Sequence, residues 1–409
     1  MSTSYDMVIA GGGPAGLSLA CLAGDLGLRV AVVDRQREDA LAHPPPDGRD
    51  IALTHRSVRI LDEIGVWGAL SPKDIAPIRS ARVKNADQPH LLCFDPEGAG
   101  REALGYLVSN QVLRRELYRA ARQRASVELL AGETAGELQL GAWTASLALS
   151  SGKVLEAPLL VAADSRFSEL RRKVGIGADM RDFGHLCIVC HLRHEKPHDG
   201  TAHEWFDTDQ TLAVLPLNEQ TSSIVLTQPA STAARSLSMP ASAFAAAIEQ
   251  RLDRRWGSMQ LDGERHAYPL VAVYADRFCA RRLALVGDAA VGMHPVTAHG
   301  FNFGLQGAET LARKVGDAIG AGSDIGAPSV LESYDRMHRR ATLPLYLATN
   351  AIVGLYTDNR MPARIVRSAL LRIANSLSPV KDFMLRKLTE CDVAQGPARR
   401  ALHLLRSHS

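Results

Sequence analysis

The stretch Met7-Val8-Ile9-Ala10-Gly11-Gly12-Gly13-Pro14-Ala15-Gly16 (residues 7–16) decides the fold of this chain. Its first four residues form an apolar run, which predicts a strand buried in a parallel sheet. Residues 15–26 are rich in Ala and Leu at helical spacing, and residues 29–33 (RVAVV) predict a second strand that ends at Asp34. The order strand, glycine turn, helix, strand, acid is typical of a dinucleotide-binding unit.

Three glycines of this turn occupy the places that the dinucleotide motif GxGxxG requires. Gly11 permits the tight turn, Gly13 allows the backbone to approach a pyrophosphate, and Gly16 allows close packing of helix and strand. The start of the helix then presents N–H groups and a positive dipole end to the phosphates. Asp34 is placed to accept hydrogen bonds from a ribose hydroxyl, which argues against the 2′-phosphate of NADP. The motif alone leaves the choice between FAD and NAD open.

Length and composition limit the classes of protein that the chain can belong to. Its 409 residues predict two or three domains, and a net charge of +3 without a basic, aromatic-rich stripe argues against nucleic-acid binding. The first strand begins too early to leave room for a signal peptide, and the apolar stretch 343–356 is too short and interrupted to span a bilayer. Six scattered cysteines fit a reducing compartment. We therefore expect a cytoplasmic protein.

Two later strands also end in acidic turns. Residues 159–163 predict a strand followed by Asp164, and residues 283–286 predict another followed by Gly287 and Asp288. Ligands of open α/β sheets bind outside the carboxyl ends of the strands, so both acids are candidate site residues.

Two helix starts carry further candidates. Arg49 comes just before a helix that begins near Leu53 and is closed by Gly65, and it is either a ligand-binding cation or a solvated loop charge. Asn110 lies near the N-cap of a helix predicted over residues 111–123.

The sequence pattern changes between residues 177 and 273. Short runs of alternating apolar and polar residues dominate there, and one helix is predicted over residues 241–256. This pattern predicts an inserted, mainly antiparallel sheet. Residues 79–84 and 91–94 predict further short strands, whereas the proline-rich segment 36–49 is expected to be a loop.

The C-terminal segment is basic. Residues 339–409 hold 12 Lys and Arg against 4 Asp and Glu, and the predicted helices break at Pro344 and later prolines. One interpretation is contact with an anionic membrane surface, and the other is a helical cap with a solvated face.

Several alternative sites are weaker. Cys187-Ile188-Val189-Cys190-His191 matches the haem attachment pattern CxxCH, but the run alternates as a strand, so its cysteines would point to opposite faces. The glycines of 320–326 follow a helix rather than a strand, so no second dinucleotide turn is predicted. No hydrolase triad, paired carboxylates, metal site or halogenase WxWxIP motif is evident, which favours chemistry carried by a cofactor.

Three separated stretches together resemble the single-component flavoprotein aromatic hydroxylases. They are the glycine turn with Asp34, the segment Ala162-Ala163-Asp164 with Ser168 and Arg171, and the segment from Gly287-Asp288 through His294-Pro295 to Gly300-Phe301-Asn302. Within that family the chain is similar to the ubiquinone-biosynthesis hydroxylases of the UbiH/UbiF group, and the loop HPVTAHGFNFGLQG is most like that of the UbiM-type members.

The resemblance implies a role for each matching position. The turn of Gly11, Gly12, Gly13, Pro14, Ala15 and Gly16 would hold the FAD pyrophosphate, with Asp34 on the adenosine ribose and Arg35 near the adenine. Arg49 and Asn110 would line the flavin, Asp288 with Gly287 would bind the ribityl chain, and Asp164 would serve FAD and the nicotinamide donor. Backbone N–H groups of Gly300, Phe301 and Asn302 would stabilise negative charge on the reduced flavin, and Pro295 would lie beside the flavin face.

Two positions depart from the family pattern. Ser165 stands where the family has Gly, which bears on the nicotinamide contact, and Ala298-His299-Gly300 replaces the commoner Gly-Gln-Gly. His299 either tunes the flavin, or assists deprotonation of a phenol, or is a passive substitution.

The expected fold is α/β, with a Rossmann-type FAD-binding domain like that of the class A flavoprotein monooxygenases, an inserted mainly antiparallel substrate domain and a helical C-terminal tail. The expected segments are 1–76, 101–176 and 274–338 for the FAD-binding domain, 77–100 and 177–273 for the substrate domain, and 339–409 for the tail.

The resemblance implies ring hydroxylation of a polyprenylated phenol or benzoquinol in ubiquinone biosynthesis. FAD, a reductant such as NAD(P)H or another electron donor, and O2 would act through a flavin C4a-hydroperoxide. Contact with the inner membrane or with a ubiquinone-synthesis complex would suit the substrate's tail. The alternatives are an FAD-dependent reductase of a prenyl lipid and a flavin-binding assembly or regulatory subunit without turnover.

Overall fold

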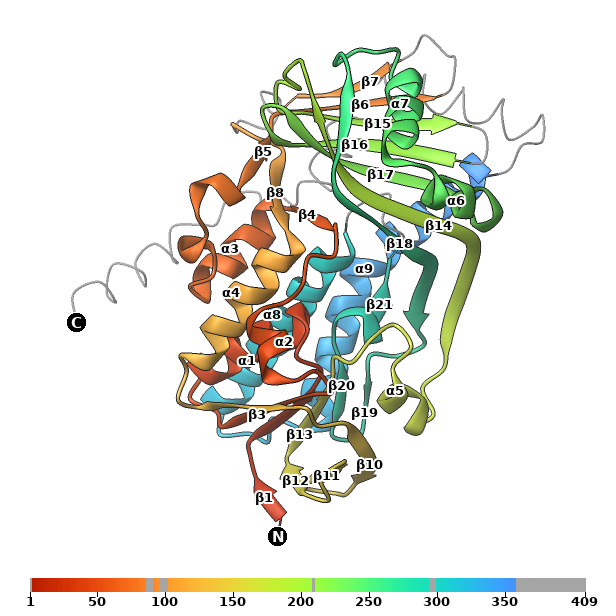
Figure 1. The fold of residues 1–409 in the computed structure, drawn as a ribbon. Helices are drawn as coiled ribbons and strands as arrows, with labels where there is room; N and C mark the ends of the chain where they lie inside the picture. The colour runs from red at the N-terminus through yellow and green to blue at the C-terminus, as the bar shows by residue number, and fades with distance from the viewer. Residues whose placement is uncertain (1, 86–90, 96–101, 208–209, 294–298, 358–409) are drawn as a thin grey trace.

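The computed structural model describes residues 2–85, 91–95, 102–207, 210–293 and 299–357. Figure 1 shows β-sheet near the N-terminus, further β-sheet at the other end of the molecule, and helices between them. The sheets near the N-terminus have six and four strands, and the sheet at the other end has eight. The expected α/β architecture with a mainly antiparallel second sheet is confirmed.

A six-stranded sheet carries the dinucleotide-binding unit. All of its neighbouring pairs are parallel except β19 with β20. In spatial order its strands are β19 (Cys279–Ala280), β20 (Leu283–Leu285), β13 (Leu159–Ala162), β2 (Met7–Ala10), β3 (Val30–Asp34) and β9 (Val127–Ala131). Because helices and the four-stranded sheet described below both pack against this sheet, residues 7–10 and 159–162 are buried throughout, as the apolar runs predict.

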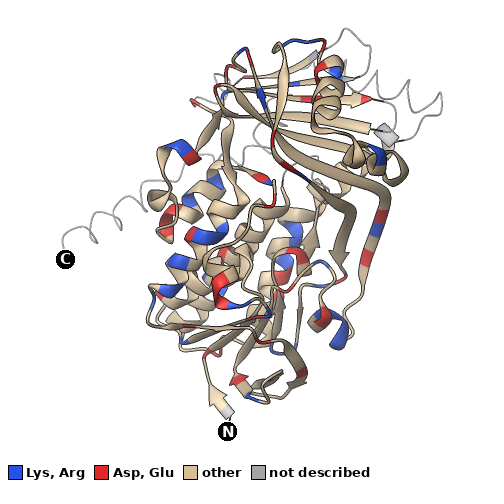
Figure 2. Cartoon of the chain, viewed as in Figure 1, with Lys and Arg blue, Asp and Glu red and all other residues tan. Residues whose placement is uncertain are grey.

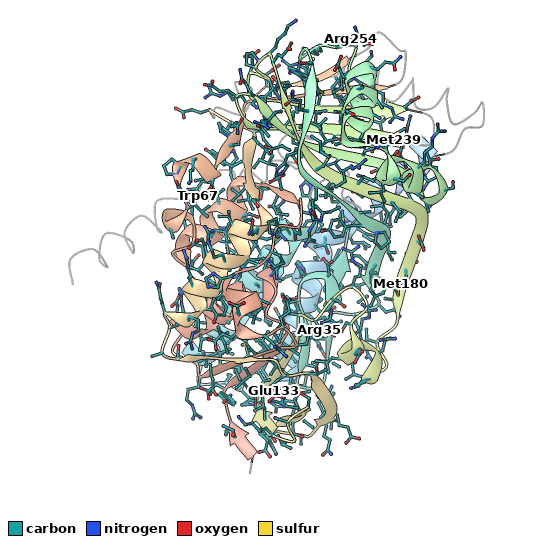
Figure 3. All side chains as sticks on the ribbon, in the orientation of Figure 1. Arg35, Trp67, Glu133, Met180, Met239 and Arg254 are labelled. Carbon is teal, nitrogen blue, oxygen red and sulfur yellow. The ribbon has the colours of Figure 1, made fainter. Side chains whose placement is uncertain are left out.

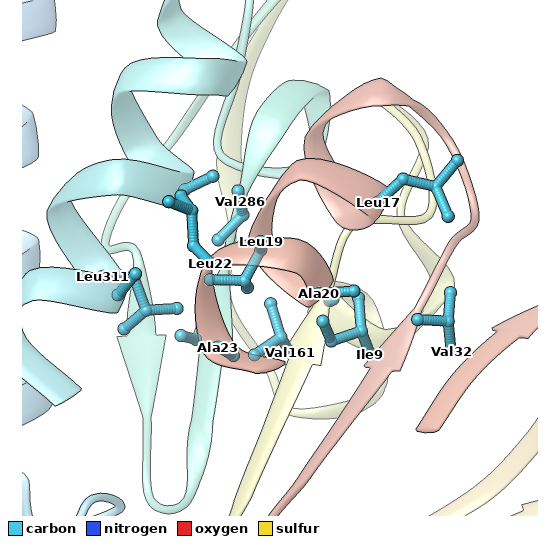
Figure 4. Close-up of a cluster of buried hydrophobic side chains, with 14 of the residues drawn as sticks. Ile9, Leu17, Leu19, Ala20, Leu22, Ala23, Val32, Val161, Val286 and Leu311 are labelled. Carbon is cyan, nitrogen blue, oxygen red and sulfur yellow. The ribbon is translucent and has the colours of Figure 1, made fainter. Parts of the chain in front are cut away.

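Four helices pack side by side over this sheet, in the order α4, α1, α8, α9. They are α1 (Pro14–Asp25), α4 (Asn110–Arg122), α8 (Gly300–Gly320) and α9 (Pro328–Thr357). Figure 4 shows the core that they share with the sheet, where Leu19 and Leu22 of α1 lie among Ile9, Val161 and Leu311.

Smaller elements complete this half of the molecule. A four-stranded sheet joins β1 (Ser2–Ser4), β12 (Val154–Ala157), β11 (Ala145–Leu149) and β10 (Ala135–Leu140), and a three-stranded sheet joins β4 (Asp50–Leu53), β8 (Gly105–Ser109) and β5 (Ala76–Ile78). The short helices are α2 (Glu38–Ala42), α3 (His55–Glu63), α5 (Glu169–Lys173) and the 3-10 turns η1 (Trp67–Ala69), η2 (Pro72–Asp74) and η4 (Gly287–Ala289).

The eight-stranded sheet contains one parallel pair, β15 with β6, and is otherwise antiparallel. In spatial order it runs β21 (Val291–Gly292), β18 (Met259–Ala275), β14 (Ala178–His194), β17 (Thr221–Pro229), β16 (Gln210–Asn218), β15 (Thr201–Asp207), β6 (Ser80–Asn85) and β7 (Leu91–Phe94). Helices α6 (Ala230–Ser238) and α7 (Ala241–Arg251) pack on one face.

The strand prediction for the two cysteines of the CxxCH pattern is confirmed. Cys187 and Cys190 are both buried in β14, but they belong to different hydrophobic clusters. Residues three apart in a strand point to opposite faces, which explains the separation.

Two local predictions are wrong. The segment 36–49 contains the helix α2, because its proline run begins only after His43 and the acidic residues Glu38 and Asp39 suit a first helical turn. Pro344 does not break the chain's last described helix, since α9 continues through it. A stripe of buried side chains at helical spacing holds that helix in place: Tyr334, His338, Thr342, Tyr346, Thr349 and Val353.

None of the described helices combines the length and the apolar character that a bilayer crossing needs. Figure 2 shows charges of both signs interspersed over the described helices rather than gathered by sign.

Candidate functional site

The glycine turn between β2 and α1 accepts no side chain at two of its positions. Gly11 has a φ of +119°, and a Cβ there would meet the backbone carbonyl of Ala163 at the end of β13. A Cβ at Gly16 would meet the carbonyl oxygen of Gly11. At Gly13, by contrast, a Cβ would have no protein atom within 4 Å. The turn is therefore closed on its protein side and open at the position where the motif places a pyrophosphate.

The open side of this turn is suited to an anion. Pro14 is the first residue of α1, and Gly13 supplies no side chain that caps the helix. The first N–H groups of a helix have no partner within it, and they carry the positive end of the helix dipole. A phosphate group satisfies both requirements, so the cradle fits a dinucleotide.

Asp34 lies where a ribose-binding acid is required. Its Oδ2 accepts a hydrogen bond from the N–H of Gly12 at 2.7 Å, and its Oδ1 accepts one from the N–H of Gln36 at 2.8 Å. These bonds fix the carboxylate at the end of β3, directly beside the turn. The next residue, Arg35, has an exposed side chain, which Figure 3 labels.

The second of the three segments, which contains Ala163 and Asp164, borders the glycine turn because it follows β13. A Cβ on Gly11 would be 3.0 Å from the Cα of Asp164, so Asp164 borders the glycine turn. The Asp164 side chain is exposed, and its Oδ2 accepts a hydrogen bond from the N–H of Glu169 at 2.9 Å. Ser165 is also exposed, and its hydroxyl accepts a hydrogen bond from the N–H of Phe167 at 3.2 Å.

The second and third segments are tied together by arginines. The Nη1 of Arg171, a side chain only 2% exposed, donates to the carbonyl oxygens of Arg166 at 3.1 Å and Ala289 at 3.0 Å. Arg166 forms an ion pair with Asp288 at 2.9 Å. The half-buried Asp288 carboxylate is thereby held near the ends of β13 and β20.

The third segment packs against the start of α1. A Cβ on Gly287, where φ is +66°, would be 2.9 Å from the Cβ of Ala15, and one on Gly304 would be 3.3 Å from it. The first turns of α1 and α8 are therefore neighbours. Gly300 and Phe301 open α8, where the first N–H groups again have no intrahelical partner.

Asn302 joins this helix start to β4. Its Oδ1 accepts a hydrogen bond from the N–H of Thr54 at 3.1 Å, and its Nδ2 donates to the carbonyl oxygen of Ala52 at 2.9 Å. The side chain of His299, directly before α8, is 3% exposed and lies 5.8 Å from the Phe303 ring. Pro295 lies outside the described residues.

Arg49 and Asn110 are brought together by an acid that sequence reasoning missed. The carboxylate of Asp47 accepts hydrogen bonds from Arg49 Nη2 at 2.6 Å and from Asn110 Nδ2 at 2.7 Å. Arg49 also lies over the Tyr268 ring at 5.0 Å, and the Tyr268 hydroxyl donates to the carbonyl oxygen of Asp47 at 2.7 Å. Burial acts to raise the pKa of Asp47, but the charge and hydrogen bonds of Arg49 and the Asn110 amide outweigh it, so the pKa is lowered.

A histidine and an aspartate link the two halves of the molecule. His191 of β14 and Asp50 of β4 lie 2.8 Å apart (Nε2 to Oδ2), with the aspartate side chain 2% exposed and the histidine 33%. The hydrogen bond that His191 donates to Asp50 raises the pKa of His191, and burial opposes that rise. Sequence pattern does not predict this pair, because its members are 141 residues apart.

The structure thus brings the predicted positions of three separated segments to one edge of the six-stranded sheet. Asp34, Asp164, Gly287 and the start of α8 all contact or border residues 11–16. Arg49 and Asn110 form a second group. Strand β4, which follows Arg49, connects this group to the first through the hydrogen bond of Asn302 to β4. Arg166 was also missed, and its only sequence signal is its place two residues after Asp164.

Comparisons with known proteins agree with this geometry. Residues 4–343 match the family model described as FAD binding domain. The chain is 40% identical to the ubiquinone hydroxylase UbiM of Neisseria meningitidis, over 95% of this chain and 85% of that protein. It is 33% identical to the ubiquinone hydroxylase UbiL of Rhodospirillum rubrum, over 93% of this chain and 88% of that protein.

Among solved structures, the p-nitrophenol 4-monooxygenase PnpA of Pseudomonas putida has a TM-score of 0.75 at 20% identity. The match covers 96% of this chain and 100% of that one, and it confirms the expected fold. Since the family model spans most of the chain and the glycine cradle fits the dinucleotide, the cofactor is FAD. The chain belongs to the FAD-binding family of flavoprotein monooxygenases and, within it, to the ubiquinone hydroxylases.

Proposed function

We propose that this chain hydroxylates the ring of a polyprenylated phenol or quinol in ubiquinone biosynthesis. The convergence of the three FAD-type segments, with the eight-stranded sheet at the other end of the molecule, is the observation that carries the proposal. The 40% identity to a ubiquinone hydroxylase over 95% of the chain supports the substrate class.

When bound, FAD would supply the redox chemistry: with two electrons from NAD(P)H or another donor, one atom of O2 would enter the ring and the other would leave as water. The protein's own residues hold and orient the reactants. The N–H groups at the start of α1 bind the pyrophosphate, Asp34 binds the adenosine ribose, and Asp288 binds the ribityl chain. The N–H groups at the start of α8 stabilise negative charge on the reduced ring system.

The loop of residues 47–49 supplies a preorganised cation beside the flavin. Asp47 holds the Arg49 guanidinium through two nitrogens and also fixes Asn110. Because that arrangement is set before ligand binding, little side-chain entropy is lost when the cofactor binds. The substrate ring then docks against the sheet, which excludes water from the reacting atoms.

The test uses FAD-reconstituted protein, NADH or NADPH, ¹⁸O-labelled O2 and a phenol that carries a short isoprenoid chain, such as 2-geranylphenol. We expect O2 consumption that depends on the phenol and a hydroxylated product carrying one labelled oxygen. Reduction of the lipid without O2 consumption would instead establish the reductase. FAD binding without any turnover, with either nicotinamide or with a chemically reduced flavin, would establish a non-catalytic subunit.

The basic C-terminal segment supports contact with an anionic membrane surface. Residues 339–409 carry 12 Lys and Arg against 4 Asp and Glu, which suits a protein whose substrate has its tail in a bilayer. The protein should sediment with vesicles containing phosphatidylglycerol and not with pure phosphatidylcholine vesicles. Removal of residues 358–409 should abolish this binding, and equal sedimentation of both proteins would contradict it.

A further inference from the structure

The eight-stranded sheet has one face that α6 and α7 cover and one that they do not. Ile188, Cys190 and Leu192 of β14 pack with Phe244 and Ile248 of α7, which identifies the covered face. Met239, after α6, and Arg254, after α7, are labelled on that side of the sheet in Figure 3. Side chains at the alternate positions of each strand occupy the opposite face.

The opposite face is turned toward the FAD-binding half. A Cβ on Gly48 would be 3.2 Å from Cγ2 of Val189 and 2.6 Å from Cδ2 of His266. His191, two residues after Val189, pairs with Asp50. The segment around Arg49 therefore lies directly on this face, at β14 and β18.

The sheet register places Glu204 on this same face. Val189 is aligned with Val225, Val225 with Ala213, and Ala213 with Glu204, so these side chains form one row across the strands. On the far side of Glu204 the row continues to Val83. A carboxyl group thus stands in a row whose neighbouring members are apolar.

The position of Glu204 also connects it to the helix start that carries Asn302. Ala202, two residues before Glu204 and on the same face, packs against the cluster of Ala76, Ile78 and Leu107, as does Ala52 of β4. Asn302 donates its hydrogen bond to the carbonyl oxygen of Ala52. Glu204 is therefore one two-residue step along β15, about 7 Å, from the cluster that borders the predicted flavin edge.

No ion pair joins Glu204 to any Lys or Arg among the described residues. Its side-chain hydrogen bond is with Thr211, which lies on the neighbouring strand β16. Burial raises the pKa of Glu204 to about 8, and the Thr211 hydrogen bond opposes that rise. The residue nevertheless keeps part of its surface accessible.

An acid placed among apolar side chains costs stability, so it requires a compensating role. A protonated carboxyl group both donates and accepts a hydrogen bond, which matches the hydroxyl of a phenol. The flanking Val83, Ala213 and Val225 match the apolar remainder of a substituted ring.

We propose that Glu204 recognises the substrate by a hydrogen bond between its carboxyl group and the ring hydroxyl of the phenol. This inference rests on the proposed function, because it assigns the polar contact of that reaction's substrate. With this contact, Glu204 is a specificity-determining residue: the enzyme binds phenols in preference to otherwise identical rings that lack the hydroxyl hydrogen.

The experiment compares the binding of 2-geranylphenol and its methyl ether to the oxidised FAD-loaded enzyme, followed by the change in flavin absorbance. The wild type should bind the phenol about tenfold more tightly, as the loss of one hydrogen bond predicts. In Glu204→Leu this preference should fall below twofold, whereas Glu204→Gln, which keeps a donor and an acceptor, should retain part of it. Glu264→Gln, on an exposed position of β18 in the same sheet, should behave as the wild type.

A tenfold preference that survives in Glu204→Leu would overturn the proposal, because a residue with a merely structural role would weaken both ligands alike. If the leucine variant does not load FAD, Glu204→Gln and Thr211→Val are compared in its place, since both change this hydrogen-bonding group with little change in volume. A reduced preference for the phenol in Glu204→Gln would support the proposal, and a preference that stays at tenfold in both variants would overturn it. A wild type that hydroxylates neither ligand would refute the proposed function itself. A wild type that hydroxylates the phenol while Glu204 variants keep the preference would refute only the role of Glu204.

Discussion

At the residue scale, the site depends on glycine positions where the space for a single Cβ atom decides whether a side chain can be accommodated. Gly11 and Gly16 have no room for a Cβ, whereas Gly13 has room but faces the predicted pyrophosphate. Sequence spacing alone predicted these glycines and Asp34, because the motif is local and strictly ordered. It could not predict Asp47, Tyr268 or the His191–Asp50 pair, since these contacts join residues from distant strands whose alignment only the fold sets.

Gly13→Ala separates ligand binding from folding. The added methyl group meets no protein atom within 4 Å, so the FAD-free protein should keep its thermal midpoint within about 2 °C of the wild type. The dissociation constant for FAD should rise at least roughly tenfold, because the methyl group occupies the space of the phosphates. Titration of FAD-free protein with FAD measures the effect. Gly68→Ala, another position with open space, is the control, and equal FAD affinities for the two variants would refute the cradle.

Asp50→Asn should lower the pKa of His191. The hydrogen bond that His191 donates to Asp50 is the largest cause of the raised pKa, and the charge of Asp262 is the smallest, so Asp262→Asn should have less effect. Because the folded pKa is above the unfolded one, the pair stabilises the protein fully below about pH 6.5. That stabilisation is lost as the pH rises through the folded pKa. An NMR titration of the His191 ring tests the order of the two variants, and a larger effect of Asp262→Asn would contradict it.

At the scale of elements, hydrophobic periodicity predicted most strands and helices but not their lengths. The alternating run that holds Cys187 and Cys190 was expected as a strand, and β14 extends well beyond it, over residues 178–194, because β18 pairs with it along nearly its whole length. Exposed residues at the start of β14 carry no hydrophobic signal, so only the partner strand reveals them. Pro344 shows the reverse case, in which tertiary packing of a buried stripe overrides a local helix breaker.

Pro344→Ala should stabilise the protein. The substitution restores a backbone N–H within α9 and removes the clash of the proline ring with the preceding turn, a gain of roughly 1–3 kcal/mol. Pro328→Ala is the matched control, because Pro328 is the first residue of α9, where an N–H has no helical partner. Differential scanning calorimetry compares the two variants. An unchanged or lower midpoint for Pro344→Ala would show that the helix is not continuous at that residue.

At the scale of the whole molecule, both halves bury histidines that resist protonation. Burial lowers the pKa of His203, in the eight-stranded sheet, to about 4, and that of His338, in α9, to about 3. These side chains are 4% and 1% exposed. The unfolded chain binds protons to both residues below about pH 6.5, so protonation favours unfolding on acidification.

The free energy of unfolding should therefore fall as the pH is lowered from about 6.5 to 4, by about 3 kcal/mol for His203 alone. His203→Gln should show a shallower decline over this range, measured by thermal unfolding at each pH. His43→Gln, which changes an exposed histidine, should follow the wild type. Parallel curves for all three proteins would show that His203 does not contribute.

The long strands β14 and β18 have a consequence for protein engineering. Ala178, where β14 begins, is aligned with Ala275, where β18 ends, so the chain leaves for the eight-stranded sheet and returns at adjacent points. Residues 178–275 therefore form a segment whose two ends are neighbours. Recombination can exchange this segment without altering the path of the chain through the glycine turn of residues 11–16. A chimaera joined at these two alanines, with a relative's intervening segment and its partner strands β6 and β7, should exchange the choice of aromatic ring while the flavin-binding half is inherited unchanged.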